Sequence, residues 1–263
     1  MFIHNFSPTL FDFGIFQIRW YSLAYIVGIL IGWWYGKIII KKKFQYYSNY
    51  LKNFDDLILY LIIGIIVGGR LGYVLFYNAS YYLDNFVEIF KIWKGGMSFH
   101  GGLVGVAIAI YFFSRLKKLN YKIYFDIVSC ISPIGICFGR IANFINGELY
   151  GIPTNKSWGV VFPSVDNILR HPSQIYEAIL EGFVLFFILN FLILKKNIKS
   201  GLVSSLFLIL YGIFRIISEQ FREPDEHLGH LFQILSMGTL LSSGMIIFGL
   251  FFLLEVRKSE NSK

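Results

Sequence analysis

Long uninterrupted runs of apolar residues dominate this chain and predict membrane-spanning helices. Alternating patterns, which mark half-buried strands, are rare by comparison. A helix needs about 20 apolar residues to cross the hydrocarbon core of a bilayer. Stretches near that length predict seven such helices, at residues 20–40, 57–77, 98–114, 123–142, 174–194, 201–217 and 231–254.

Composition points to the same class of protein. Of the 263 residues, 56% are hydrophobic and 15% carry charge, whereas soluble domains carry charge on about a quarter of their residues. No linker or internal repeat divides the chain. We therefore predict an all-α, polytopic membrane protein in which residues 1–263 form a single integral membrane domain, with a small head loop at 143–172.

The charge distribution predicts the orientation of the helices. The chain has 24 Lys and Arg against 16 Asp and Glu, a net charge of +8, which on a soluble chain would suggest binding to nucleic acid. Most of the basic residues follow the first, third, fifth and seventh predicted helices. By the positive-inside rule that side is cytoplasmic. We therefore expect the N-terminus and the head loop outside, the C-terminus in the cytoplasm, and no nucleic-acid partner.

Three arginines are out of place in this pattern, because they lie inside or at the edge of predicted spans. They are Arg70, Arg140 and Arg215, each in the outer half of its helix. An arginine at the centre of a membrane helix costs about 2.5–3.5 kcal/mol on insertion scales, so each needs a partner or a function. If the helices close into a bundle, the three can meet in one polar cavity that opens outward.

The densest polar cluster surrounds Arg140, where residues 139–151 read GRIANFINGELYG. Two interpretations are open. Arg140 and Glu148 either pair with each other to close a loop, or they join Asn143 and Asn146 in a site for a lipid headgroup. A planar guanidinium suits a phosphate group, which favours the headgroup site.

Two further clusters carry candidate chemistry. His100 lies among glycines at the start of the third predicted span, and its ordinary pKa of about 6.5 suits proton transfer near neutrality. A buried histidine held by hydrogen bonds is the alternative. Tyr211, Arg215 and Glu219 follow one helix face at intervals of four, so Glu219 is expected to pair with Arg215. That pair can be structural, or Arg215 can be a second cation for the same phosphate.

Several other residues give weaker signals. Arg70 either binds lipid or neutralises a glutamate such as Glu177. Tyr21 fits an aromatic belt at the membrane interface. Ser173 is expected to cap the helix that follows it.

Small residues at intervals of four predict close contacts between helices in lipid. This spacing occurs in Gly28, Gly32 and Gly36, in Gly64, Gly68 and Gly72, in Gly101 and Gly105, and in Gly135 and Gly139. Cys130 and Cys137 lie in one apolar segment and are expected to be packing residues.

Several enzyme signatures are missing from the sequence. It contains no H-E-x-x-H, no Cys/His metal spacing, no G-x-S-x-G and no Walker-type loop, which argues against a metalloprotease, a serine hydrolase and a nucleotide-driven pump. We therefore expect no metal and no organic cofactor.

The run at 139–151 resembles the signature of prolipoprotein diacylglyceryl transferases, G-R-x-[GA]-N-F-x-N-x-E-x-x-G. Further blocks of the chain are similar to the family in the same order. They are GRLGYVLFYN at 69–78, GGMSFHGG at 95–102, RHPSQ at 170–174, YGIFR at 211–215 and FREPD at 221–225. The resemblance therefore extends over nearly the whole chain.

The resemblance implies a bacterial inner-membrane enzyme with seven helices whose active site faces the outer (periplasmic) leaflet. The reaction it implies transfers the sn-1,2-diacylglyceryl group of phosphatidylglycerol to the lipobox cysteine thiol of a prolipoprotein signal peptide. A thioether forms and glycerol phosphate is released, as the first step of lipoprotein maturation. The partners are then the donor lipid, the acceptor peptide and the bilayer.

The resemblance also suggests roles for individual residues. Arg140 and Arg215 match the family's essential arginines, and we expect them, with His100 as the base and Glu148, to be catalytic. The residues expected to bind phosphatidylglycerol are Arg140, Asn143, Asn146, Gly151, Arg215, Tyr21, Arg70, Glu219 and Arg222. The stretch from Gly151 to Arg170 is shorter than in many members, so the structure of the head loop is not predicted in detail.

A phospholipid transporter or flippase is the alternative function, because the same arginines would bind an anionic headgroup without chemistry. Such a protein is expected to show internal repeats and paired broken helices. The sequence shows no repeat, which favours the transferase.

Overall fold

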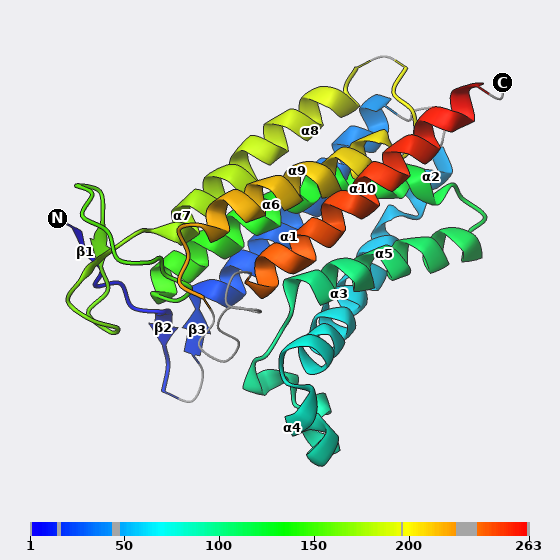
Figure 1. The fold of residues 1–263 in the computed structure, drawn as a ribbon. Helices are drawn as coiled ribbons and strands as arrows, with labels where there is room; N and C mark the ends of the chain where they lie inside the picture. Colours follow the sequence, from blue (N-terminus) through cyan, green and yellow to red (C-terminus); the bar gives the residue numbers. More distant parts are fainter. Residues whose placement is uncertain (1, 15–16, 44–47, 196, 225–235, 262–263) are drawn as a thin grey trace. The chain divides into compact units, whose positions relative to one another are not determined.

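The predicted number of membrane spans is confirmed. The computed structural model describes the chain except for residues 1, 15–16, 44–47, 196, 225–235 and 262–263. Within that part, seven helical segments are long and apolar enough to cross a membrane. They are α1 (Trp20–Lys43), α3 (Phe54–Tyr77), α5 (Phe99–Leu116), α6 (Tyr121–Asn146), α7 to α8 (Ser173–Ile193), α9 (Leu202–Glu219) and α10 (Met237–Asn261) (Figure 1).

Helix α6 is longer than its apolar run predicted. The run ends at residue 142, but the helix continues to Asn146. The prediction stopped where polar residues begin, since these are costly in lipid. Asn143 and Asn146 extend the helix because both amides donate hydrogen bonds to Glu148. Of the predicted span at 231–254, residues 231–235 lie outside the described residues.

The fifth span changes its winding along its length. Helix α7 (Ser173–Glu177) runs into η3 (Ala178–Val184), a π-helical stretch, and then into α8 (Leu185–Ile193). π-Helical turns are rare and occur frequently at functional sites. The apolar run predicted a span here, and nothing in it predicted the change of winding.

Short elements accompany the predicted helices. Three strands form a small sheet in the order β1-β4-β5, with β1 parallel to β4 and β4 antiparallel to β5, and β2 pairs antiparallel with β3. The short elements are β1 (Phe2–Ile3), β2 (Thr9–Asp12), β3 (Gln17–Arg19), β4 (Val160–Val161), β5 (Leu169–Arg170), α2 (Ser48–Lys52), α4 (Ala79–Asp84), η1 (Phe86–Phe90) and η2 (Ile92–Lys94).

The chain divides into two compact units. The first comprises Met1–Gly36 and Val128–Lys263, and the second comprises Lys37–Ile127. In the first unit α9 lies beside both α8 and α10, and in the second α3 lies beside α5 (Figure 1).

The second unit is held together by glycines, as their spacing predicted. A Cβ added to Gly68 would lie 2.8 Å from the Cα of Gly105, and one added to Gly72 would lie 2.6 Å from the Cα of Gly101. Helices α3 and α5 therefore touch backbone to backbone. In lipid the hydrophobic effect does not drive helices together, because the acyl chains are as apolar as the helix surfaces. Close van der Waals packing therefore joins the helices.

The first unit also has close helix contacts at glycines, at two places. A Cβ on Gly28 would lie 3.0 Å from the Cα of Gly135, and one on Gly182 would lie 2.6 Å from the Cβ of Cys137. The second contact presses the π-helical stretch η3 against α6. Cys130 is buried and Cys137 is partly buried, which agrees with their prediction as packing residues.

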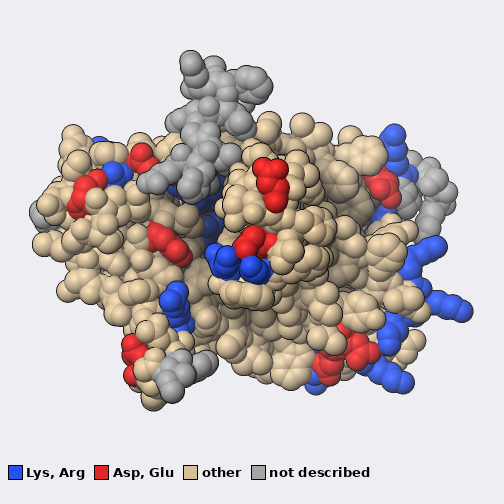
Figure 2. Space-filling view, turned by 90° about the horizontal axis from the view of Figure 1, so that it is seen from below, with Lys and Arg blue, Asp and Glu red and all other residues tan. Residues whose placement is uncertain are grey.

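The surface fits a lipid environment. Most of the face seen in Figure 2 is neither basic nor acidic. Large apolar side chains are exposed along several helices, such as Trp34, Leu75 and Phe251, with 61%, 65% and 65% of their surface accessible. In water such a surface would aggregate, so the exposed faces of these helices are suited to contact with acyl chains.

Candidate active site

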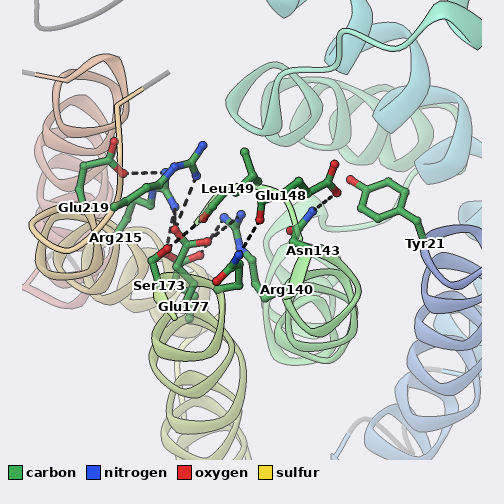
Figure 3. Close-up of polar contacts among 12 residues, drawn as sticks. Tyr21, Arg140, Asn143, Glu148, Leu149, Ser173, Glu177, Arg215 and Glu219 are labelled. Atoms are coloured by element: carbon green, nitrogen blue, oxygen red, sulfur yellow. Dashed lines mark hydrogen bonds and ion pairs between the residues drawn. The ribbon is translucent and has the colours of Figure 1, made fainter. Parts of the chain in front are cut away.

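Two of the three intramembrane arginines meet in the first unit. Arg140 comes from α6 and Arg215 from α9, and both point at carboxylates of the fifth span (Figure 3). Those carboxylates belong to Glu177, the last residue of α7, and Glu181, in η3. Neither carboxylate has any exposed surface.

The ion pairs in this cluster are short. Arg140 lies 2.9 Å from Glu177 and 3.1 Å from Glu181. Arg215 lies 2.6 Å from Glu177 and 3.6 Å from Glu181, and its other terminal nitrogen lies 2.7 Å from Glu219. The predicted pair between Arg215 and Glu219 is therefore confirmed, and it is one part of a larger network.

The alternative that paired Arg140 with Glu148 is wrong. Arg140 contacts Glu177 and Glu181 instead, while the Glu148 carboxylate accepts hydrogen bonds from the side-chain amides of Asn143 at 2.7 Å and Asn146 at 3.3 Å. Sequence proximity favoured the local pair, but residue 140 faces the fifth span.

A tight turn after α6 returns Glu148 to this position. Gly147 has a φ of +69°, a left-handed conformation that glycine adopts without steric cost. Leu149 also has a positive φ, +57°, which is costly for a branched residue. Its carbonyl accepts a hydrogen bond from the Ser173 hydroxyl at 2.9 Å, and the carbonyl of Glu148 accepts one from Gln174 at 2.7 Å. The start of α7 therefore holds the turn in place.

Ser173 was expected to cap its own helix, and that expectation is wrong. The residue before α7 is Pro172, and no side chain caps the helix start. The Ser173 hydroxyl donates to the loop instead. A cap would satisfy a free N–H group of the helix, whereas this contact satisfies a carbonyl of the strained turn.

Tyr21 lies on the same side of the cluster as Glu148. Its hydroxyl points toward the Glu148 carboxylate in Figure 3. It also shares a hydrogen bond of 3.0 Å with the hydroxyl of Tyr25, one helical turn further along α1. The hydroxyl of Tyr25 and the direction of Glu148 give Tyr21 a polar environment, in addition to the interface position that its aromatic ring suggested.

Gly151 and Arg222 lie together at the end of α9. They form an isolated antiparallel bridge, and the Gly151 N–H donates to the carbonyl of His171 at 2.9 Å. A Cβ on Gly151 would collide with the carbonyl oxygens of His171 and Phe221. The close crossing of three chain segments is thus sufficient reason for glycine at this position.

Arg222 extends the ion-pair network, at 3.6 Å from Glu177. A cavity of about 220 Å³ opens beside this part of the network. Both Glu219 and Arg222 line it, together with Ile152, Gln220, Pro224, Ser236 and Thr239. Asp225, the last residue of the FREPD block, lies outside the described residues.

The loop at 147–172 has its own ion pairs. Arg170 lies 2.6 Å from Asp166 and 3.0 Å from Glu223, and it donates to the carbonyl of Gly151 at 3.0 Å. The hydrogen bonds from Arg170 hold the pKa of Asp166 below its ordinary value, and they raise the pKa of Arg170. The fully buried Phe162 ring packs against the rings of Phe144 and Tyr150.

Arg70 lies in the second unit, where its guanidinium contacts backbone. Its Nε donates to the carbonyl of Ile89 at 2.9 Å. One terminal nitrogen donates to the carbonyls of Gly95 and Gly96, and the other donates to the backbone carbonyl of Glu88 at 2.7 Å. The guanidinium also lies over the ring of Tyr82, 5.1 Å from its centroid. These contacts hold η1 and the glycines after η2 against α3. Lipid binding by Arg70 stays a prediction.

His100 also belongs to the second unit. It lies in the first turn of α5, where Ser98 caps the helix by accepting a hydrogen bond from the N–H of Gly101 at 3.2 Å. Its ring is partly buried and packs edge-on against Phe99. Its role as a base stays a prediction.

Sequence reasoning missed the two glutamates at the centre of the network. Glu177 was considered only as a partner for Arg70, and Glu181 was not considered. Their spacing of four residues within an apolar run was the available signal, because two carboxylates on one helix face in lipid require cationic partners.

Comparison with known proteins shows the family of the chain. The sequence model of the family described as prolipoprotein diacylglyceryl transferase matches residues 8–255. The chain belongs to this family. Curated relatives support the match over nearly their full length. A phosphatidylglycerol–prolipoprotein diacylglyceryl transferase of Rickettsia bellii (strain OSU 85-389) is 51% identical over 253 residues, which cover 95% of each chain.

Two further relatives with the same name come from Rickettsia canadensis and Rickettsia typhi. They are 51% and 49% identical over 251 residues, which cover 95% of this chain and 96% of each relative. Membership in the prolipoprotein diacylglyceryl transferase family, together with the seven spans, identifies a multi-pass membrane protein and favours the enzyme over the transporter.

Proposed function

We propose that this chain transfers the sn-1,2-diacylglyceryl group of phosphatidylglycerol to the lipobox cysteine thiol of prolipoproteins. The name of the curated relatives supports both the donor and the acceptor. In the reaction a bond forms between the cysteine sulfur and a glycerol carbon. The bond from that carbon to a phosphate oxygen breaks, and glycerol phosphate leaves with the electron pair.

The meeting of Arg140 and Arg215 on the same two carboxylates carries this proposal. Negative charge builds on the departing glycerol phosphate, and two guanidinium groups in a buried site can stabilise it. Such preorganised donors act most strongly where water is excluded and the dielectric is low. A planar guanidinium can also bind two phosphate oxygens at once.

The remaining residues fit supporting roles in this proposal. The thiol has an ordinary pKa of about 8.5 and reacts as the thiolate, so we assign His100 as the base that accepts its proton. Glu148, with the amides of Asn143 and Asn146, orients the headgroup beside Tyr21. Glu219 and Arg222 line a cavity of about 220 Å³ next to Arg215, and Gly151 shapes the loop behind them.

We further propose the location of the enzyme. The chain forms one membrane domain in the bacterial inner membrane, with its N-terminus and the 143–172 loop outside and its C-terminus in the cytoplasm. The bias of Lys and Arg toward alternate helix ends supports this orientation. The active site then faces the outer leaflet.

The test is a reaction with defined substrates. The purified protein is incubated with phosphatidylglycerol micelles and a peptide that carries a lipobox cysteine, and the peptide mass and free glycerol phosphate are measured together. We expect a diacylglyceryl mass gain with equimolar glycerol phosphate, both lost when the peptide thiol is blocked. A folded protein that binds the lipid and yields neither product would contradict the transferase and favour the flippase.

A further inference from the structure

Glu177 and Glu181 have no assigned role in the reaction, yet they are the most deeply buried charged groups in the described part of the chain. Both have a relative exposure of 0%. Each contacts Arg140 and Arg215. The two arginines proposed to hold the phosphate therefore share the same two carboxylates.

Glu177 forms the more symmetrical bridge. One of its oxygens lies 2.9 Å from a terminal nitrogen of Arg140, and the other lies 2.6 Å from a terminal nitrogen of Arg215. A carboxylate is rigid, so the distance between its two oxygens limits how far apart the two guanidinium groups can lie. Glu181 repeats the bridge with longer contacts, 3.1 Å to Arg140 and 3.6 Å to Arg215.

The winding of the fifth span presents both carboxylates to the arginines. Glu177 ends α7 and Glu181 lies within η3, where a turn takes more than four residues. Residues four apart therefore face nearly the same direction. Gly182 adds to this, because its missing side chain lets η3 approach α6 at Cys137, three residues before Arg140.

Stability alone does not explain this arrangement. Two buried carboxylates and two buried guanidinium groups lose most of their hydration, and apolar residues of similar volume are often as stable as a buried ion pair or more so. An ionisable residue inside a membrane is costly, so its presence there indicates a function by default. What the network does achieve is a fixed geometry, since Arg140 contacts two carboxylates and Arg215 contacts three.

We propose that Glu177 and Glu181 are positioning residues, which set the spacing and orientation of Arg140 and Arg215 for the phosphate group of the donor lipid. This inference rests on the proposed function of those arginines. It predicts a larger loss of transfer rate when Glu177 is replaced than when Glu181 is replaced, because Glu177 has the shorter contacts with the two arginines.

The inference also predicts an unusual combination of kinetic effects. The ion pairs join three arginines, at 140, 215 and 222, to three glutamates, at 177, 181 and 219. Replacing one carboxylate by the neutral amide of the same shape leaves an excess positive charge. The anionic lipid then binds as well as before or more tightly, while the guanidinium groups are no longer aligned with the leaving phosphate.

The experiment compares Glu177→Gln and Glu181→Gln with the wild-type protein and with Glu88→Gln. Glu88 is a matched control because its carboxylate also bridges two cations, Lys91 at 2.5 Å and Lys94 at 2.7 Å, on a different part of the chain. Initial rates of thioether formation are measured against phosphatidylglycerol concentration in mixed micelles with saturating lipobox peptide. Thermal unfolding in the same detergent reports the folded fraction.

We expect kcat to fall about 10- to 100-fold in Glu177→Gln, which is the cost of small misplacements in a preorganised site. KM for the lipid should stay equal or decrease. Glu181→Gln should show the same pattern with a smaller loss, and Glu88→Gln should match the wild type.

Different outcomes separate the inference from the proposed function. If the wild type forms no thioether, the proposed function fails, whatever the variants do. If the wild type reacts and both glutamine variants keep its kcat and KM, the positioning role is wrong. A lower kcat that disappears once rates are divided by the folded fraction also overturns it. If Glu177→Gln does not fold, Glu181→Gln is the test. A lower kcat together with a changed ³¹P NMR shift of the lipid bound to Glu181→Gln supports the positioning role, and wild-type values of both overturn it.

Discussion

Replacement of Arg140 tests whether this residue acts on the substrate or only neutralises buried carboxylates. In Arg140→Met, Glu177 and Glu181 lose contacts of 2.9 and 3.1 Å while both remain fully buried. Removing one partner from a buried ion pair costs about 3–5 kcal/mol, because the charge left behind has no compensation. For a chain of this size about 1 kcal/mol corresponds to roughly 2–4 °C in Tm. We therefore expect Tm to fall by roughly 6–20 °C.

The double variant Arg140→Met/Glu181→Leu separates the two roles. It removes one cation and one anion and fills the space with apolar groups of similar volume. Arg215 keeps its contacts with Glu177 at 2.6 Å and Glu219 at 2.7 Å. Stability should therefore return toward that of the wild type, whereas the rate should stay about 10²- to 10³-fold low, the usual loss for one preorganised donor.

The assay is a double-mutant cycle with two readouts, Tm in detergent and turnover of phosphatidylglycerol with a lipobox peptide. Lys117→Met is the matched control, because Lys117 pairs with Asp56 at 3.1 Å at an exposed site, where an ion pair contributes about 0–1 kcal/mol. If the double variant regains both stability and turnover, Arg140 serves only as a counter-ion, and its assignment to the phosphate is refuted.

Three further predictions concern other parts of the molecule. Gly151→Ala should lower stability by about 1–3 kcal/mol through overpacking against the carbonyls of His171 and Phe221. Gly244→Ala should not lower stability, because open space surrounds Gly244. Equal Tm values for the two variants would contradict the close crossing of chain segments at Gly151. Burial and the nearby Lys156 lower the pKa of His171, so the unfolded chain binds this proton more readily than the folded chain does. The stability from His171 should be complete above about pH 6.5 and lost as the pH falls from there through the lower folded value; His171→Gln should remove this part of the pH dependence of Tm, and an unchanged profile would argue against it. A lysine at position 70 cannot reproduce the guanidinium group that donates to the backbone carbonyls of Ile89, Gly95 and Glu88. In Arg70→Lys, proteolysis within residues 86–96 should therefore become faster, with KM for the lipid unchanged. A raised KM with unchanged proteolysis would support lipid binding by Arg70.

The helices and the family could be read from the sequence because both depend on local information. A span is a run of apolar residues long enough for the bilayer, and lipid imposes that requirement on each helix separately. Glycines at intervals of four likewise predicted contacts such as those between Gly68 and Gly105 and between Gly28 and Gly135. The pair of Arg215 and Glu219 followed from helix geometry alone.

The partners of the other charged residues depended on the tertiary structure. Arg140 has Glu148 nearby in sequence, but the direction of its side chain on α6 brings it to Glu177 and Glu181, 37 and 41 residues away. Arg70 was expected at a lipid or a glutamate, and the structure shows its guanidinium donating to backbone carbonyls of η1 and of the glycines after η2. Apolar patterns specify which face of a helix avoids water, and they do not specify which helices become neighbours. The pairing of buried charges is fixed only when that choice is made.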